Sequence, residues 1–193
     1  MPRLDHAANG ATRRAMSDGE AARTHYATMP SPFGPLLLAA RGPGLVWIGF
    51  ARGRGARRPA RDWVRSPGRL GAARGQLAAY FAGRRRRFTL PLAPEGTPFQ
   101  RRVWRALLRV PYGTTITYTD LARRAGRPAA IRAAGAANGQ NPLSIVVPCH
   151  RVVGRDGALT GYGGGLAVKA ALLELERGPR AAPKASKRRS HHA

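Results

Sequence analysis

Cysteine and acidic residues are scarce in this sequence of 193 residues. It has one cysteine, Cys149, and 9 Asp and Glu against 34 Lys and Arg, which gives a formal net charge of +25. A single thiol excludes an intramolecular disulfide and leaves Cys149 without a resolving partner, and it fits a reducing cytosol. Long apolar runs are absent too, because no segment approaches the roughly 20 residues that a membrane helix needs.

The N-terminal sequence MPRLDHAANGATRRAMSDGE has no apolar core of the kind that a secretory signal requires. We therefore expect a soluble protein that stays in the cytoplasm and does not bind membranes.

The excess of positive charge points to a polyanionic partner, and nucleic acid is the most abundant polyanion. Of the 34 basic residues, 31 are arginine. A GC-rich coding bias would also enrich arginine, so the charge alone leaves both explanations open.

The first half of the chain mixes short strands with one helix. Residues 1–23 show no periodicity and are expected to form a tail, and 24–94 are expected to form an α+β domain with a small antiparallel sheet. Apolar runs separated by turn residues, and apolar residues at helical spacing, predict its elements. These are strands at Leu36–Ala40, Leu45–Phe50 and Phe88–Leu92, and a helix at Leu70–Phe81 with Leu70, Ala73, Leu77 and Phe81 on one face.

The second half, residues 95–178, is expected to be mainly helical, and the basic segment 179–193 to be a second tail. Thr97, Pro98 and Gln100 form a helix start with a capping box. Two short helices, Thr119–Ala125 and one that begins at Pro128 and ends near Gly139, flank a glycine-containing turn. This pattern predicts a winged-helix-like helix-turn-helix, and Leu166–Glu176 is the last amphipathic helix.

Cys149 lies in the sequence IVVPCHRVV, with His150 and Arg151 directly after it. Positive charge beside a thiol favours its ionised form, so this position is suited to a thiolate of low pKa. By itself a Cys-His pair is a weak signal, because adjacent residues on an extended chain point to opposite sides. Its surroundings make it specific: a helix-turn-helix precedes it, and the loop GYGGGLAVK (161–169) follows it.

This combination resembles the O6-alkylguanine-DNA alkyltransferases, also called methylated-DNA–protein-cysteine methyltransferases. The likeness covers about residues 97–176, with a weaker echo at SPFGPLLLA and LVWIGF in the first half. It implies repair of O6-alkylguanine in DNA by irreversible transfer of the alkyl group to a protein cysteine. It leaves activity on O4-alkylthymine open.

The resemblance assigns a role to each matching residue of the site. Cys149 matches the alkyl acceptor, His150 the base that deprotonates it through a water, and Glu176 the carboxylate that holds this histidine, a Cys-base-orienter arrangement. Asn141 matches the residue that braces the turn beneath Cys149. Glu174 is a competing carboxylate in the same helix, but its position does not match the motif.

Other matching residues would contact the substrate. Tyr118 matches the tyrosine that donates a proton to the departing guanine. Backbone groups of Cys149 and Val152 would read the exocyclic amine, Gly163 would approach O6, and Tyr162 would form the lid of the pocket.

Contacts to DNA are expected from the second helix of the helix-turn-helix. A base inside a duplex must be flipped out to reach a thiol, and Arg132 matches the arginine that fills the gap. Small residues such as Ala133 and Gly135 would let this helix lie close to the minor groove. We also expect Arg151 to contact substrate or DNA.

Double-stranded DNA with O6-alkylguanine is therefore the expected partner of a monomer that needs no cofactor. Some relatives hold zinc, but the absence of a second cysteine predicts none here. Three alternatives remain: a non-catalytic binder of alkylated DNA, a basic helix-turn-helix regulator, and a cysteine hydrolase. A non-catalytic binder would lack the acceptor cysteine, a regulator would need base-reading side chains where this sequence has alanines, and a hydrolase would turn over.

Overall fold

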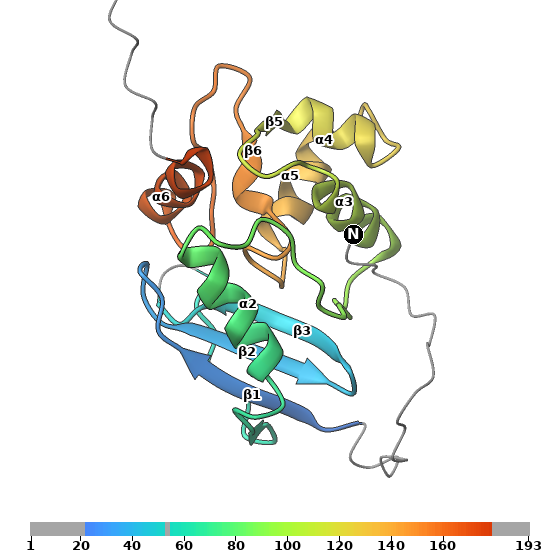
Figure 1. The fold of residues 1–193 in the computed structure, drawn as a ribbon. Coiled ribbons are helices and arrows are strands. Elements are labelled where there is room, and N and C mark those ends of the chain that lie inside the picture. The colour runs from blue at the N-terminus through green and yellow to red at the C-terminus, as the bar shows by residue number, and fades with distance from the viewer. Residues whose placement is uncertain (1–21, 53–54, 179–193) are drawn as a thin grey trace, which may run out of the picture.

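The computed structural model describes residues 22–52 and 55–178, so the two expected tails lie outside the described residues apart from residues 22 and 23. None of the helices in this part of the chain is long and apolar enough to cross a membrane. The described chain forms a sheet half and a helical half stacked on each other (Figure 1).

The sheet half contains four strands in the order β3-β2-β1-β4. They are β1 (Thr24–Met29), β2 (Leu36–Arg41), β3 (Gly44–Phe50) and the two-residue β4 (Val64–Arg65). The first three pair antiparallel, and β4 runs parallel to β1. Both strands predicted from the apolar runs at 36–40 and 45–50 are therefore present.

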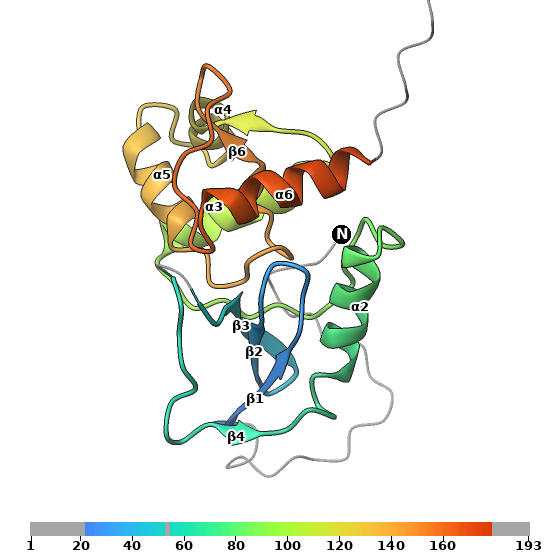
Figure 2. The same ribbon diagram turned by 90° about the vertical axis from the view of Figure 1, so that its left-hand side faces the viewer.

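Helix α2 (Gly71–Phe81) covers one face of this sheet (Figures 1 and 2). Its buried residues are Ala73, Leu77 and Tyr80, whereas Phe81 is only half-buried. The predicted apolar face therefore needs a correction at its C-terminal end. Tyr80 follows Leu77 by three residues and stays on the buried side of the helix.

The strand expected at Phe88–Leu92 is wrong. This segment makes only an isolated bridge between Leu92 and Leu45, with hydrogen bonds on either side of it. The apolar side chains of this segment are buried as expected of a strand, but the segment itself is an extended connection between the two halves.

Four helices and a small parallel ladder build the helical half. In chain order they are α3 (Pro98–Leu108), β5 (Ile116–Thr117), α4 (Tyr118–Arg124), α5 (Ile131–Gly139), the 3₁₀ turn η1 (Cys149–Arg151), β6 (Val152–Val153) and α6 (Leu166–Arg177). The predicted capping box at Thr97 and Gln100 is present, with Gln100 N–H donating to Thr97 Oγ1 at 3.2 Å. Thr117 caps α4 in the same way with Asp120.

Helix α5 starts three residues later than Pro128. The chain first turns through 127–130, where Ala130 N–H donates to the Arg127 carbonyl at 2.9 Å, and only then enters the helix. Proline suits the first position of a helix, but it also occurs in turns, and here the turn prevails. The expected helix-turn-helix is formed by α4 and α5, and the α+β fold class is confirmed.

The edge strand β3 joins the two halves. Ile48 N–H donates to the Pro142 carbonyl at 2.8 Å, and Ser144 N–H donates to the Ile48 carbonyl at 2.9 Å. The segment that leads to Cys149 is therefore held against the edge of the sheet, and α6 lies above it (Figure 2).

Candidate functional site

Cys149 begins the 3₁₀ turn η1 and is buried, with 5% of its surface exposed. The run before it does not form a strand. Ile145 has φ of 74°, a conformation that a β-branched residue rarely adopts, and this sharp bend directly follows the contacts of residues 142–144 with β3. Because η1 is helical rather than extended, Cys149 and His150 do not alternate as residues of a strand would.

Asn141 braces the turn, as the resemblance implies. Its Nδ2 donates to the Val147 carbonyl at 2.8 Å and lies 3.1 Å from Cys149 Sγ, and its Oδ1 accepts from Leu143 N–H at 3.0 Å. This one amide fixes both the backbone around the cysteine and the sulfur itself.

His150 is fully buried, and its Nε2 lies 2.9 Å from Glu176 Oε1. Burial lowers the pKa of His150, and the hydrogen bond and charge of Glu176 offset only part of this effect, so the ring is neutral near pH 7. An ionised carboxylate only accepts hydrogen bonds, which places the single ring proton on Nε2. The other nitrogen, Nδ1, is a buried acceptor with no partner among the described residues.

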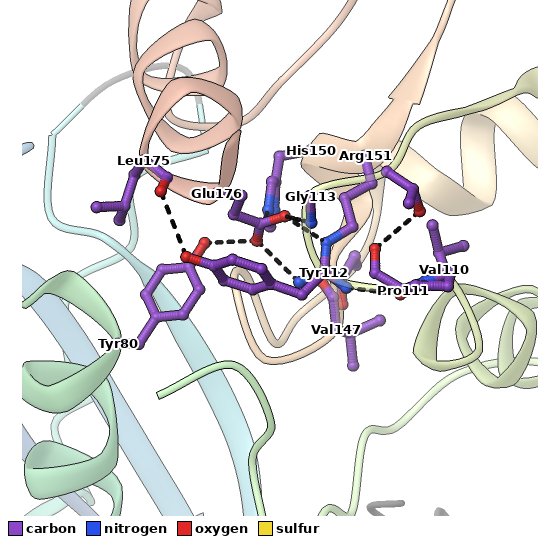
Figure 3. Close-up of polar contacts among 12 residues, drawn as sticks. Tyr80, Val110, Pro111, Tyr112, Gly113, Val147, His150, Arg151, Leu175 and Glu176 are labelled. Atoms are coloured by element: carbon purple, nitrogen blue, oxygen red, sulfur yellow. Dashed lines mark hydrogen bonds and ion pairs between the residues drawn. The ribbon is translucent and has the colours of Figure 1, made fainter. Parts of the chain in front are cut away.

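The Glu176 carboxylate lies at the centre of a network of donors (Figure 3). Oε1 accepts from Tyr80 Oη at 2.7 Å and from Arg151 Nη2 at 2.8 Å, besides His150. Oε2 accepts from Arg151 Nε at 2.8 Å and from Gly113 N–H at 3.0 Å. Burial alone would raise the pKa of Glu176, but the bonds from His150 and Arg151 hold it well below the usual range.

Arg151 does not lie where a residue contacting DNA would. Its side chain is only 7% exposed, and its guanidinium binds Glu176 through two nitrogens and the Val110 carbonyl through the third. The 3₁₀ turn points the side chain inward, and a buried guanidinium needs an anionic partner. We therefore reassign Arg151 from substrate or DNA contact to the carboxylate network.

The resting thiol is not the low-pKa thiolate that its sequence neighbours suggested. Burial raises the pKa of Cys149, and the Asn141 hydrogen bond and the positive charge of Lys169 oppose this only in part. The two expected sources of charge do not act on it, because His150 is neutral and Arg151 is neutralised by Glu176. The thiol therefore needs a base.

Lys169 has no role in the sequence analysis, although it ends the quoted GYGGGLAVK loop. It is fully buried, and Nζ donates to the carbonyls of Val152 at 2.6 Å and Thr160 at 2.7 Å. It ties the loop after β6 to the strand that leaves the active site. A lysine on the buried side of an amphipathic helix is the only sequence signal that marks it.

A small cavity of about 90 Å³ opens beside Cys149. Tyr162, the predicted lid residue, and Gly163, predicted to approach O6, both line it, and Tyr162 packs edge-on against His150 and Phe50. A Cβ at Gly164 would lie 2.7 Å from the Phe50 ring, so only glycine allows this close approach. Trp47, Phe50 and Gly55 extend the lining into the sheet half, which the sequence did not reveal.

Tyr118 and Arg132 lie outside the lining of this cavity. Tyr118 is half-buried at the start of α4, and its Oη accepts from Thr160 Oγ1 at 3.0 Å. Gly135 of α5 faces the Tyr118 ring, so the two helices meet closely at this point. Arg132 and Ala133 are exposed on α5, whereas Val152 is buried, and its carbonyl already accepts from Lys169.

No group of three or more His, Cys, Asp or Glu among the described residues is arranged to hold a metal ion. Glu174, the competing carboxylate, is exposed, whereas Glu176 is buried in the network.

Two family models match the chain. Residues 24–94 match the ribonuclease-like domain of 6-O-methylguanine DNA methyltransferase, and residues 98–178 match the DNA-binding domain of the same family. A methylated-DNA–protein-cysteine methyltransferase of Mycobacterium bovis is 51% identical over 154 residues, 79% of this chain and 92% of the relative. One of Methanosarcina barkeri is 47% identical over 152 residues, 79% of this chain and 96% of the relative.

Solved structures agree with these matches. The Mycobacterium tuberculosis O6-methylguanine methyltransferase is similar with a TM-score of 0.75 and 49% identity, over 82% of this chain and 96% of that one. The same organism's protein in complex with DNA gives a TM-score of 0.74 and 49% identity, over 79% and 92% of the two chains. The chain belongs to the family of methylated-DNA–protein-cysteine methyltransferases.

Proposed function

We propose that this protein repairs O6-alkylguanine in DNA by moving the alkyl group irreversibly to Cys149 Sγ. The observation that carries the proposal is the buried series Cys149, His150 and Glu176, beside a cavity in a protein with a helix-turn-helix. Each chain offers one acceptor thiol, and the described site is built from one chain, so we infer that a monomer acts once.

The proton and the electron pair balance in one displacement. His150 Nδ1 takes the Cys149 proton, through a water as the family resemblance implies, and the sulfur attacks the alkyl carbon. The carbon–oxygen bond breaks, and the guanine leaves with the bonding electrons. The product is a thioether, which water does not hydrolyse, and this explains why the protein would not turn over.

Glu176 determines which ring nitrogen of His150 can act as the base. The ionised carboxylate fixes the ring proton on Nε2 and stabilises the imidazolium that forms when Nδ1 gains a proton. The Nδ1 atom supports this assignment, because it has no hydrogen-bond partner among the described residues and so is open to accept a proton from the thiol through a water.

The departing guanine carries negative charge, which a nearby donor would neutralise. We assign this role to the Tyr118 hydroxyl, whose bond to Thr160 anchors it beside the 160–164 loop. The Gly163 amide and the backbone of Cys149 and Val152 would bind the base itself.

We infer that α4 and α5 bind the DNA in its minor groove and that the damaged nucleotide is flipped out. The small residues of α5, Ala133 and Gly135 among them, allow close approach, and few side chains remain for reading bases. Affinity should therefore depend on phosphate contacts and fall steeply with salt.

Arg132→Ala tests the flipping step. Without a side chain to fill the gap, we expect duplex repair at saturating DNA to slow by about tenfold. The corresponding rise in activation free energy is a fraction of the few kcal/mol that flipping a base costs. Transfer from the free alkylguanine base, which needs no flipping, should keep its rate. Single-turnover rates on the two substrates measure this, and equal losses on both would contradict the assignment.

The proposed function itself is tested with a duplex that carries one O6-methylguanine. We expect one guanine to be restored per protein molecule, with no further repair after that equivalent. Tight binding without repair would indicate a non-catalytic binder, and continued turnover would indicate a hydrolase.

A further inference from the structure

Tyr80 belongs to the sheet half, yet it reaches the centre of the catalytic network in the helical half. Its ring is fully buried near the C-terminal end of α2 and packs against Phe88 and Tyr112. Its hydroxyl donates to Glu176 Oε1 at 2.7 Å, across 96 positions of sequence (Figure 3). The motifs that carry the family resemblance do not include this residue.

The role of Tyr80 follows from which oxygen of Glu176 it binds. Oε1 is the same oxygen that accepts from His150 Nε2 at 2.9 Å. A buried phenol needs an acceptor, and a backbone carbonyl would satisfy it equally well. Tyr112, whose ring packs against that of Tyr80, is satisfied in that way, because its hydroxyl donates to the Leu175 carbonyl at 3.3 Å.

We propose that Tyr80 is a positioning residue for alkyl transfer, which holds the Glu176 carboxylate and takes up part of its charge so that His150 remains a neutral base. This inference rests on the proposed function. It makes the sheet half part of the chemistry, because α2 supplies a donor to the carboxylate on α6.

The charged and titratable groups around His150 determine whether removal of the Tyr80 hydroxyl raises or lowers the pKa of His150. Glu176 on α6 raises the pKa of His150, whereas Arg151 on η1 and Lys169 on α6 lower it. Tyr80 remains a donor throughout, because burial and the charge of Glu176 raise its pKa far above neutral. Without its hydroxyl, more negative charge on Oε1 faces His150, and the imidazolium becomes more favourable.

Tyr80→Phe removes the hydroxyl and keeps the ring. Because His150 must be neutral to accept the thiol proton, transfer fails as the pH falls through the pKa of His150. We expect the acidic limb of the single-turnover rate profile, measured between about pH 5 and pH 9 on the free alkylguanine base, to move upward by about half a unit or more. DNA affinity should not change.

Tyr112→Phe is the matched control. It also removes one phenolic hydroxyl beside Glu176, but this hydroxyl does not bind the carboxylate. Its acidic limb should coincide with that of the unmodified protein. Coincident profiles for all three proteins, or equal displacement of both variants, would overturn the proposal.

A titration of the His150 ring by nitrogen-15 NMR separates this proposal from the proposed function, because it needs no transfer. The signal is assigned by its loss in His150→Gln. A higher pKa of His150 in Tyr80→Phe than in the unmodified protein supports the role of Tyr80 even if no alkyl group moves. An unchanged pKa overturns it even if transfer is normal, and thermal melts show that the variant is folded.

Discussion

Glu176→Ala is expected to abolish alkyl transfer and to lower the free energy of unfolding by about 3–5 kcal/mol, the cost of leaving a buried charge unpaired. The charge left behind is that of Arg151, whose buried guanidinium binds the carboxylate through two nitrogens. The same change frees Tyr80 and the Gly113 amide and removes the acceptor that fixes the His150 tautomer. This one substitution removes five hydrogen bonds that the carboxylate accepts.

Urea unfolding and single-turnover transfer measure the two losses, and Glu174→Ala is the matched control. Glu174 lies two residues away on the same helix and is exposed, so its removal should change unfolding by less than about 0.5 kcal/mol. A similar small change in Glu176→Ala would contradict the network that we describe.

The difference in the free energy of unfolding between the unmodified protein and Glu176→Ala should also depend on pH. The pKa of Glu176 is lower in the folded protein than in the unfolded chain, so its stabilisation is complete above the ordinary carboxyl pKa of about 4.3. This stabilisation is lost as the pH falls toward the lowered pKa that Glu176 has in the folded protein. The gap between the unmodified protein and Glu176→Ala should therefore narrow in acid.

Cys149→Ser should lower alkyl transfer by at least about a thousandfold, because a hydroxyl is a far weaker nucleophile than a thiolate near neutral pH. The substitution nearly preserves the size of the side chain, and Asn141 retains a partner at the same position. DNA binding through α4 and α5 should be unchanged, since Cys149 is buried.

Gel-shift affinity for the damaged duplex and the transfer rate are the two readouts for this variant. Loss of transfer with retained affinity separates chemistry from binding. Substantial transfer by the serine variant would remove Cys149 from the role of acceptor.

Local signals in the sequence predicted most of the helices and the acceptor candidate. The Thr97 capping box and the amphipathic helix at 166–176 depend on neighbouring residues, so they are readable before folding. Cys149, His150 and Glu176 came from a motif, and the structure brings the latter two to 2.9 Å. Their catalytic roles stay predictions.

The parts that sequence did not reveal depend on distant contacts. Tyr80 meets Glu176 only because the two halves stack, and nothing near either residue in the sequence marks the pair. The direction of the Arg151 side chain follows from the 3₁₀ turn, which the β-branched run around it did not suggest. The raised pKa of Cys149 is a consequence of burial, whereas sequence shows only its charged neighbours.

The most direct test of the central claim is the mass of the peptide that contains Cys149 after incubation with an O6-methylguanine oligonucleotide. We predict a gain of one CH₂ unit on this peptide, stoichiometric with the guanine restored and stable to further incubation. An unmodified Cys149 peptide in a preparation that has restored guanine, or a methyl group on another peptide, would contradict the account.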